Sequence, residues 1–357
     1  MESFHQAFES QETQTFRTTS IMTMMTTKTP LISVITPVYG VEKFIEGFAV
    51  SLFEQTYENI EYIFVNDATK DSSMTILKNL IEERYSHLED KIMILDKEVN
   101  EGLPKARKDG LAVAHGDYIL HVDSDDWMDK DMVEQLAAKA IEGDYDIVYC
   151  DFYYEWDERT EIISEPTYTA TSKDKAKFLN DILDWGTANA YTWNKLIAAR
   201  VYKNPVKHPK YSYHEDLLLT CQLICYAKSI AHVQKPLYHY RKDNMASISN
   251  DPATERRRKM ESRSNLLELY RFLKNFDDRS IYDYVMDNIL YYVGWYAFKF
   301  DRDWIKTHPE LKYDLKEVTI SQEHLLPLPK QIIIRSFLGL STLMAKMRQN
   351  LSTAEKA

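Results

Sequence analysis

Residues 31–39 read Leu-Ile-Ser-Val-Ile-Thr-Pro-Val-Tyr, and this stretch decides the fold class. Its short apolar run stops at Pro37, which is typical of a buried strand. Three similar runs follow at Ile60–Val65, Lys91–Leu95 and Tyr118–Val122. In the segments between these runs, apolar residues recur at helical spacing. This strand–helix alternation predicts an α/β fold with a mostly parallel sheet covered by helices on both faces.

The segments between these strands carry ordinary helix signals. Apolar residues recur at helical spacing over Val41–Gln55, and Asp71-Ser72-Ser73 can cap a helix that runs to about Tyr85. Pro104 opens a third helix that runs to Ala114. We expect another strand at Asp146–Phe152 and an amphipathic helix at Glu215–Ala227.

The chain divides into three predicted parts. Residues 1–30 are rich in Thr, Ser, Gln and Met, which is typical of a disordered or loosely attached tail. Residues 31–250 hold the α/β domain. Residues 251–357 are predicted to form an α-helical C-terminal extension.

Composition excludes some functions. The 357 residues contain 44 Lys and Arg and 55 Asp and Glu, a net charge of −11, which argues against a nucleic-acid partner. None of the nine glycines forms a G-x-G-x-x-G or P-loop motif. Any phosphate ligand must therefore be held another way, and the many carboxylates suggest a metal ion.

Polar clusters follow three of the predicted strands: Pro37-Val38-Tyr39, Asn66-Asp67 and Asp123-Ser124-Asp125. Ligands of such sheets bind at the carboxyl ends of the strands, so these clusters should converge. Two carboxylates spaced as Asp123-x-Asp125 can bind Mg²⁺ or Mn²⁺, which is commonly completed by water and substrate phosphates. The alternative is a solvated acidic turn that begins the next helix.

Several motifs, in order over residues 31–249, resemble family 2 glycosyltransferases. They are Ile32–Tyr39, Ser51-x-x-x-Gln55-Thr56-Tyr57, Val65–Ser72, Asn100-Glu101-Gly102-Leu103 with Ala106-Arg107, and Gly116–Asp126. The resemblance implies a GT-A nucleotide-sugar fold. It also implies a nucleoside diphosphate-sugar donor, with uracil as the usual base, and inversion at the anomeric carbon.

The resemblance assigns roles position by position. It places Pro37, Tyr39 and Glu42 along the donor nucleotide and Asp67 opposite the base. Arg107 would approach the nucleotide, and Lys105 could add a phosphate contact or be solvated. Further along the chain, Asp123 would face the ribose or sugar, with Ser124 beside it. Asp125 would be the Mn²⁺ or Mg²⁺ ligand, and His239 would be an additional metal ligand or a packed ring. His121 replaces the apolar residue usual before the metal motif, as a core histidine or an influence on donor choice.

The base is expected in His214-Glu215-Asp216, which resembles the family's E-D pair. Asp216 would take the proton from the acceptor hydroxyl, with Glu215 as the alternative base. N-terminal helix capping by these acidic residues is the other interpretation. Arg241, in a segment resembling the family's closing Y-R motif, could neutralise the diphosphate as the bond breaks.

The predicted activity is transfer of a sugar from a UDP-sugar to a glycan or lipid-linked acceptor in cell-surface polysaccharide synthesis. A sugar nucleotidyltransferase and a non-catalytic sugar-nucleotide-binding protein are the alternatives. Residues 325–349 could form a basic amphipathic helix that lies on a membrane, or one that packs on its own domain or a partner chain. We therefore expect a cytoplasmic protein, with peripheral membrane contact and homo-oligomer formation both open.

Overall fold

Strand β1 (Ile32–Val38) lies inside the sheet and pairs in parallel with β2 (Ile60–Asn66) on one side and β4 (Tyr118–His121) on the other. The structure, a computed structural model, describes residues 29–184, 186–244 and 254–301. Strand β3 (Ile92–Asp96) extends the parallel part beyond β2. All seven residues of β1 are buried, as expected for a strand with helices on both faces.

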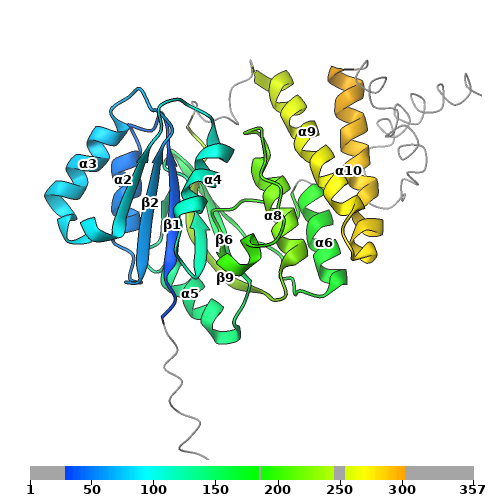
Figure 1. Cartoon of the computed structure of the whole chain (residues 1–357), viewed down its shortest axis with the longest axis horizontal. Coiled ribbons are helices and arrows are strands. Elements are labelled where there is room, and N and C mark those ends of the chain that lie inside the picture. The colour runs from blue at the N-terminus through cyan, green and yellow to red at the C-terminus, as the bar shows by residue number, and fades with distance from the viewer. Residues whose placement is uncertain (1–28, 185, 245–253, 302–357) are drawn as a thin grey trace, which may run out of the picture. The chain divides into compact units, whose positions relative to one another are not determined.

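Helices cover both faces of this parallel part (Figure 1). Helix α4 (Leu103–Val113) packs on one face, where Ile35 and Ile63 form a small apolar cluster with Ala106. Helices α2 (Ile45–Phe53) and α3 (Ser73–Arg84) belong to the main core on the other side. Each helix lies where the sequence predicts one, with ends shifted by a few residues.

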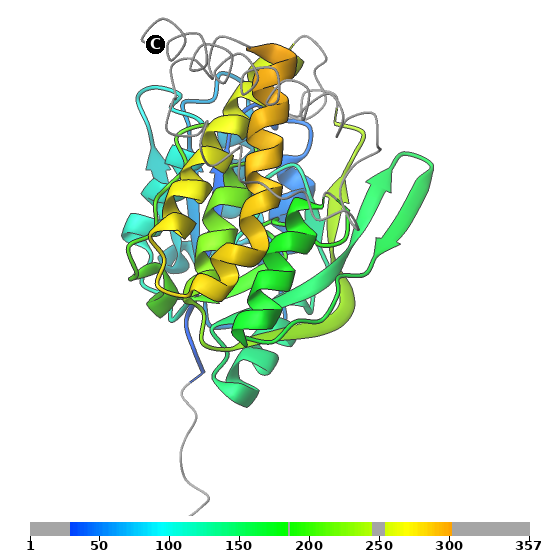
Figure 2. The same ribbon diagram turned by 90° about the vertical axis from the view of Figure 1, so that its right-hand side faces the viewer.

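Beyond β4 the sheet becomes mixed, a change that strand–helix alternation does not predict. Its strand order is β3-β2-β1-β4-β8-β6-β9-β5, with β7 paired to β6. The additional strands are β5 (Trp127–Met128), β6 (Ile147–Trp156), β7 (Arg159–Ile163), β8 (Lys195–Ala198) and β9 (Ile230–Arg241). Strand β8 runs antiparallel to β4 and β6, whereas β6 and β9 are parallel. The β6–β7 hairpin extends to one side in Figure 2.

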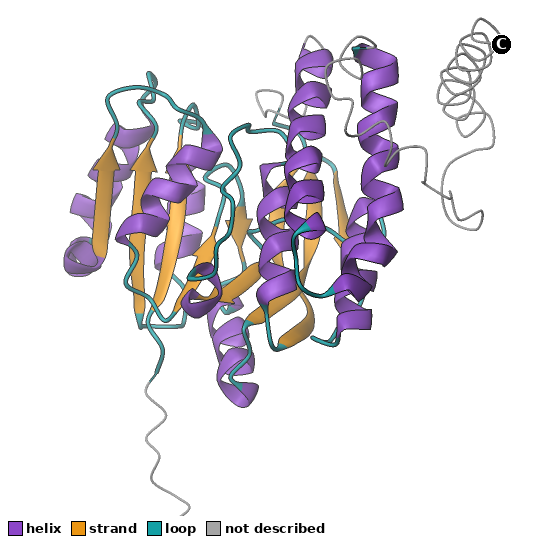
Figure 3. Ribbon diagram, turned by 45° about the vertical axis from the view of Figure 1, so that its right-hand side comes forward, coloured by secondary structure: helices purple, strands orange, loops and turns teal. Residues whose placement is uncertain are grey.

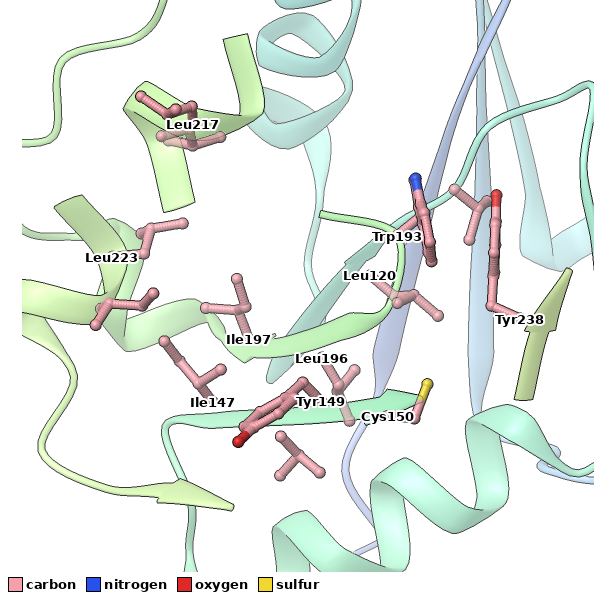
Figure 4. Packing of buried hydrophobic residues seen from close by; sticks show 14 of the residues in the cluster. Leu120, Ile147, Tyr149, Cys150, Trp193, Leu196, Ile197, Leu217, Leu223 and Tyr238 are labelled. Atoms are coloured by element: carbon pink, nitrogen blue, oxygen red, sulfur yellow. The ribbon is translucent and has the colours of Figure 1, made fainter. Parts of the chain in front are cut away.

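Buried aromatic and aliphatic side chains join the two parts of the sheet. Figure 4 shows Leu120 of β4, Tyr149 of β6 and Ile197 of β8 in one cluster with Trp193 and Tyr238. Trp193 stacks on Tyr238 with ring centroids 4.3 Å apart. This packing holds Tyr238 of β9, whose hydroxyl lies 3.2 Å from the Asp123 backbone N just after β4.

The remaining helices are α5 (Met132–Gly143), α6 (Ser172–Leu183), α7 (Ala199–Tyr202), α8 (Glu215–Tyr226), α9 (Glu255–Lys274) and α10 (Arg279–Phe300), with a 3₁₀ turn at Ser86–Lys91. Helices α6, α8, α9 and α10 pack together (Figure 3), whereas α5 packs on β6, β8 and β9. Helix α9 contacts α8, and α10 contacts α6 and α9. The predicted C-terminal helices are thus present up to Phe300, while a domain boundary at residue 250 stays a prediction.

Two expectations concern residues outside the described ranges. Nearly all of the predicted tail, residues 1–28, and the amphipathic segment 325–349 lie there. Within the described ranges, no helix combines the length and the apolar character needed to cross a membrane.

Gly110 allows α4 to approach the sheet closely. A Cβ at this position would lie 2.4 Å from Ile35 Cγ2 and 3.2 Å from Val65 Cγ2. We expect Gly110→Ala to lower the free energy of unfolding by about 1–3 kcal/mol, because a packed core resists added volume. Gly47→Ala, on an open part of α2, is the matched control and should raise stability by about 0.5–1 kcal/mol. Urea denaturation measures both; equal effects would contradict this account of α4.

Candidate active site

The three polar clusters meet at the carboxyl ends of β1, β2 and β4, as the sequence predicts. Ser124, which is buried, donates a hydrogen bond to the Pro37 carbonyl over 2.7 Å and so ties the loop after β4 to the end of β1. The Asp67 backbone N–H donates to the Val38 carbonyl over 3.1 Å. The strand ends are therefore joined directly by hydrogen bonds.

The acidic loop Asp123–Asp126 is held from the opposite side by β9 and the residues after it. The Asp126 carboxylate accepts hydrogen bonds from the Tyr238 hydroxyl and the Arg241 backbone N–H, each over 2.8 Å. The Tyr238 hydroxyl also accepts from the Asp123 backbone N–H over 3.2 Å. Asn244 donates to Asp125 Oδ2 over 2.8 Å. Sequence reasoning gave no role to Asp126, Tyr238 or Asn244, because their partners lie more than 110 positions away.

The loop concentrates negative charge in a buried place. Burial, with the neighbouring Asp123, raises the pKa of Asp125 to about 6. Burial, with Asp125 and Asp123, also raises the pKa of Asp126 well above its ordinary value. Carboxylates that disfavour one another's charge in this way are relieved by a nearby cation.

This donor set fits a hard divalent ion only in part. The Asp126 carboxylate is taken by Tyr238 and Arg241, and Asp123 contacts Arg107, which leaves Asp125 as the best-placed ligand. Among the described residues there is no group of three or more His, Cys, Asp and Glu side chains arranged to hold a metal. Mg²⁺ and Mn²⁺ sites of this kind use one or two carboxylates and complete their shell with water and phosphates. Asp125 with a bound diphosphate would satisfy that requirement.

The structure places His239 in other contacts. Its Nδ1 lies 2.7 Å from Glu155 Oε1 and its Nε2 lies 3.1 Å from Asp129 Oδ1. The ring stacks between Trp127 and Tyr153. Both nitrogens are therefore engaged where β5 pairs with β9, which favours the packed-ring interpretation over a metal ligand.

Arg107 is the central cation of the site. It lies on α4, is only 4% exposed, and its Nη2 is 2.6 Å from Asp123 Oδ1 while its Nη1 contacts Glu215. Burial opposes the charge, but Glu215, Asp123 and Asp216 raise the pKa of Arg107 above its ordinary value. The guanidinium thus bridges the acidic loop and α8, an arrangement that the expected nucleotide contact does not describe.

Glu215 and Asp216 open α8 but differ in their surroundings. Glu215 is buried and contacts Arg107, and burial raises its pKa to about 8. Asp216 is partly exposed and accepts a hydrogen bond from the Leu217 N–H over 2.8 Å. Burial raises the pKa of Asp216, while Arg107 lowers it and Asp123 raises it. Asp216 thus follows the residue that Arg107 links to the acidic loop, and it is the more accessible carboxylate of the pair.

The predicted nucleotide-side residues surround the ends of β1 and β2. Tyr39 is 52% exposed, so its ring is open to a ligand. Asp67 is buried and accepts hydrogen bonds from the Glu101 and Gly102 N–H groups over 3.0 and 2.8 Å. Lys97, which sequence reasoning missed, forms an ion pair with Asp67 over 2.7 Å.

Three further residues predicted for the site, Glu42, Lys105 and Arg241, form contacts within the protein. Glu42 accepts a hydrogen bond from the Ser72 N–H over 3.0 Å, and Lys105 forms an ion pair with Asp109. Arg241 lies over the Phe44 and Trp127 rings, and its Nε donates to the Asp125 carbonyl over 3.0 Å. Arg241 thus contacts the acidic loop, whereas the contacts of Glu42 and Lys105 lie within their own segments.

The family model described as "Glycosyl transferase family 2" matches residues 33–204. Over these residues, just under half of the chain, the sequence matches this family. The matched residues include the acidic loop and β1 to β8. Helix α8, with Glu215 and Asp216, follows the matched segment.

A curated relative is EpsH of Bacillus subtilis (strain 168), which is 31% identical over 221 residues. The match covers 60% of this chain and 61% of EpsH, so the chain spans less than two thirds of this relative. It supports the family assignment independently of the family model.

Solved structures confirm the GT-A fold. S. aureus TarS 1-349 in complex with UDP-GlcNAc has a TM-score of 0.59 and 20% identity, covering 81% of this chain and 80% of that one. The mannosyltransferase PcManGT from Pyrobaculum calidifontis, in complex with GDP-Man and Mn²⁺, has a TM-score of 0.52 and 12% identity, covering 88% and 81%. At these identities the likeness concerns the fold alone.

Removing Arg107 should leave the buried Glu215 and the partly buried Asp123 without their partner. We expect Arg107→Met to lower the free energy of unfolding by about 3–5 kcal/mol, the usual cost of breaking a buried ion pair from one side. In the double variant Arg107→Met, Glu215→Met, much of that loss should be recovered, since no buried charge remains at position 215. Denaturant unfolding of the four proteins gives the coupling energy. Additive losses would show that the contact carries no energy.

Proposed function

We propose that the protein is an inverting glycosyltransferase that moves a sugar from a nucleoside diphosphate-sugar, with UDP as the favoured nucleotide, to an acceptor hydroxyl. The observation that carries the proposal is the link that Arg107 makes between Asp123 of the acidic loop and Glu215, the neighbour of the partly exposed Asp216. A site for a diphosphate and a candidate base are thus adjacent. The complexes of TarS with UDP-GlcNAc and of PcManGT with GDP-Man support this donor class at the level of the fold.

In the proposed reaction, Asp216 accepts the proton of the acceptor hydroxyl as that oxygen attacks the anomeric carbon. The bond between this carbon and the donor's β-phosphate oxygen breaks in the same displacement, and the diphosphate leaves with the electron pair. Attack from the face opposite the leaving group inverts the configuration. Glu215 is the poorer base because Arg107 already pairs with it.

The leaving diphosphate needs positive charge. Arg241, held over Phe44 and Trp127 at the Asp125 carbonyl, can supply part of it. A divalent ion on Asp125, with Asp123 as the second carboxylate of the motif, would neutralise more of the developing charge. The Mn²⁺ in the PcManGT complex supports such a metal at the level of the fold.

The nucleotide would lie along the ends of β1 and β2. Tyr39 is exposed enough to contact the base or ribose, and Pro37 and Ser124 shape the floor of this region. Asp67 is proposed to face the base, with its carboxylate oriented by the Gly102 N–H and Lys97. The acceptor is proposed to be a glycan or a lipid-linked sugar of a cell-surface polysaccharide.

Asp216→Asn tests the base. We expect kcat for UDP release to fall by about 10²–10⁴-fold, because positioned proton transfer contributes that much. Affinity for the UDP-sugar, measured by calorimetry, should change by less than about threefold. Asp131→Asn, at the start of α5, is the matched control for an acidic residue that only begins a helix. If both variants kept full turnover with a donor that the wild type uses, Asp216 would only begin helix α8 and would not be the base.

Asp125→Asn tests the metal ligand. Mn²⁺ with UDP should raise the melting temperature of the wild type, since a ligand at 100 times Kd adds about 2.7 kcal/mol. EDTA should remove the Mn²⁺-dependent part of the shift, and Asp125→Asn should abolish it. Asp129→Asn, a change in a nearby carboxylate that contacts His239, should retain it. A rise in melting temperature on adding UDP that depends on neither Mn²⁺ nor Asp125 would contradict the metal assignment.

A further inference from the structure

His121 is the last residue of β4 and lies two positions before Asp123. It is 2% exposed, and neither ring nitrogen has a hydrogen-bond partner among the described residues. The Tyr202 ring meets the imidazole edge-on, with centroids 6.3 Å apart. A buried imidazole without partners is costly, so His121 calls for an explanation.

Two more unpartnered atoms belong to residues that line the same space. Arg107 Nε and Glu215 Oε2 are also buried without a hydrogen-bond partner in the described part of the chain. Arg107, His121 and Glu215 line one small pocket with Pro104, Leu111 and His208. Its volume is about 10 Å³. That is close to the space needed for a single water molecule, which requires two to four polar partners.

We propose that a buried water molecule occupies this pocket and bridges His121 to Arg107 and Glu215, which makes His121 a positioning residue for the Arg107–Glu215–Asp123 cluster. The chemistry of the three groups is complementary. Arg107 Nε–H can only donate and Glu215 Oε2 accepts, while a neutral imidazole has one donor and one acceptor nitrogen. A water molecule can accept from Arg107, donate to Glu215 and make its third hydrogen bond to either kind of imidazole nitrogen.

The network depends on a polar side chain at position 121. An apolar side chain at position 121 could not bind the water. It would leave Arg107 Nε and Glu215 Oε2 facing an apolar wall.

We expect that loss of this water would leave the guanidinium of Arg107 less firmly oriented. Its Nη1 and Nη2 hold Glu215 and Asp123, and the water would hold the third edge of the same guanidinium. A guanidinium fixed on three edges positions α8, which carries Asp216, against the loop that carries Asp125. The kinetic part of this inference rests on the proposed transferase function; the water and its hydrogen bonds do not.

The experiment compares His121→Leu with His121→Gln in the full chain. Glutamine retains a donor and an acceptor, whereas leucine is the apolar replacement. We expect His121→Leu to lower kcat/KM for the donor about tenfold and to lower the melting temperature, because Arg107 Nε and Glu215 Oε2 would lose their bridging partner. His121→Gln should stay within about threefold of the wild type. His87→Leu, on the exposed surface, controls for histidine loss elsewhere.

Two readouts do not require turnover. A high-resolution crystal structure should show a water within 2.7–3.2 Å of Arg107 Nε and Glu215 Oε2. The Nε–H signal of Arg107 in ¹H–¹⁵N spectra should exchange faster in His121→Leu than in His121→Gln. An empty pocket, or an Arg107 signal and donor kinetics that are the same in both variants, would overturn the inference. A protein with the water present but no transfer with any donor would overturn the proposed function alone.

Discussion

The contact of Arg107 with Asp123 and Glu215 is the interaction on which the arrangement of the site depends. It joins the loop after β4 to the first turn of α8, although these residues are far apart in the chain. A buried cation between two carboxylates is stable only as a complete set, since each unpaired charge would carry a large desolvation cost. The fold must therefore bring α4, β4 and α8 together at one place, and the parallel sheet provides the rigid base for this.

The acidic loop has a second support from the mixed part of the sheet. Tyr238 and the Arg241 backbone, both from β9, hold Asp126, and the Trp193 ring packs on Tyr238. Lys195, which is fully buried, donates hydrogen bonds to the Asn189 and Tyr191 carbonyls and so holds the segment that carries Trp193. The antiparallel strands thus orient the carboxylates that the parallel strands present.

The prediction from sequence was most accurate where patterns are local. Apolar runs ending in polar residues located β1, β2 and β4, and the carboxyl ends of these strands meet as expected, with Ser124 bonded to Pro37. Partners within the protein were not predicted. Arg107, expected to approach the nucleotide, has its guanidinium shared by two carboxylates. His239, expected as an additional metal ligand or a packed ring, has Glu155 and Asp129 at its nitrogens. A side chain's partner depends on distant strands and helices, which spacing along the chain does not encode.

The sequence by itself determined the α/β class, the strand ends where polar groups gather, and the acidic motif. These follow from hydrophobic periodicity and from the preference of turns for polar residues. Only the tertiary structure decided which carboxylates are free to act. Asp126 and Glu215 are engaged by Tyr238 and Arg107, whereas Asp216 remains partly exposed. The physical reason is burial. Chemically identical carboxyl groups differ in pKa and in accessibility, because the fold determines which of them are desolvated and which have a charged or hydrogen-bonding partner.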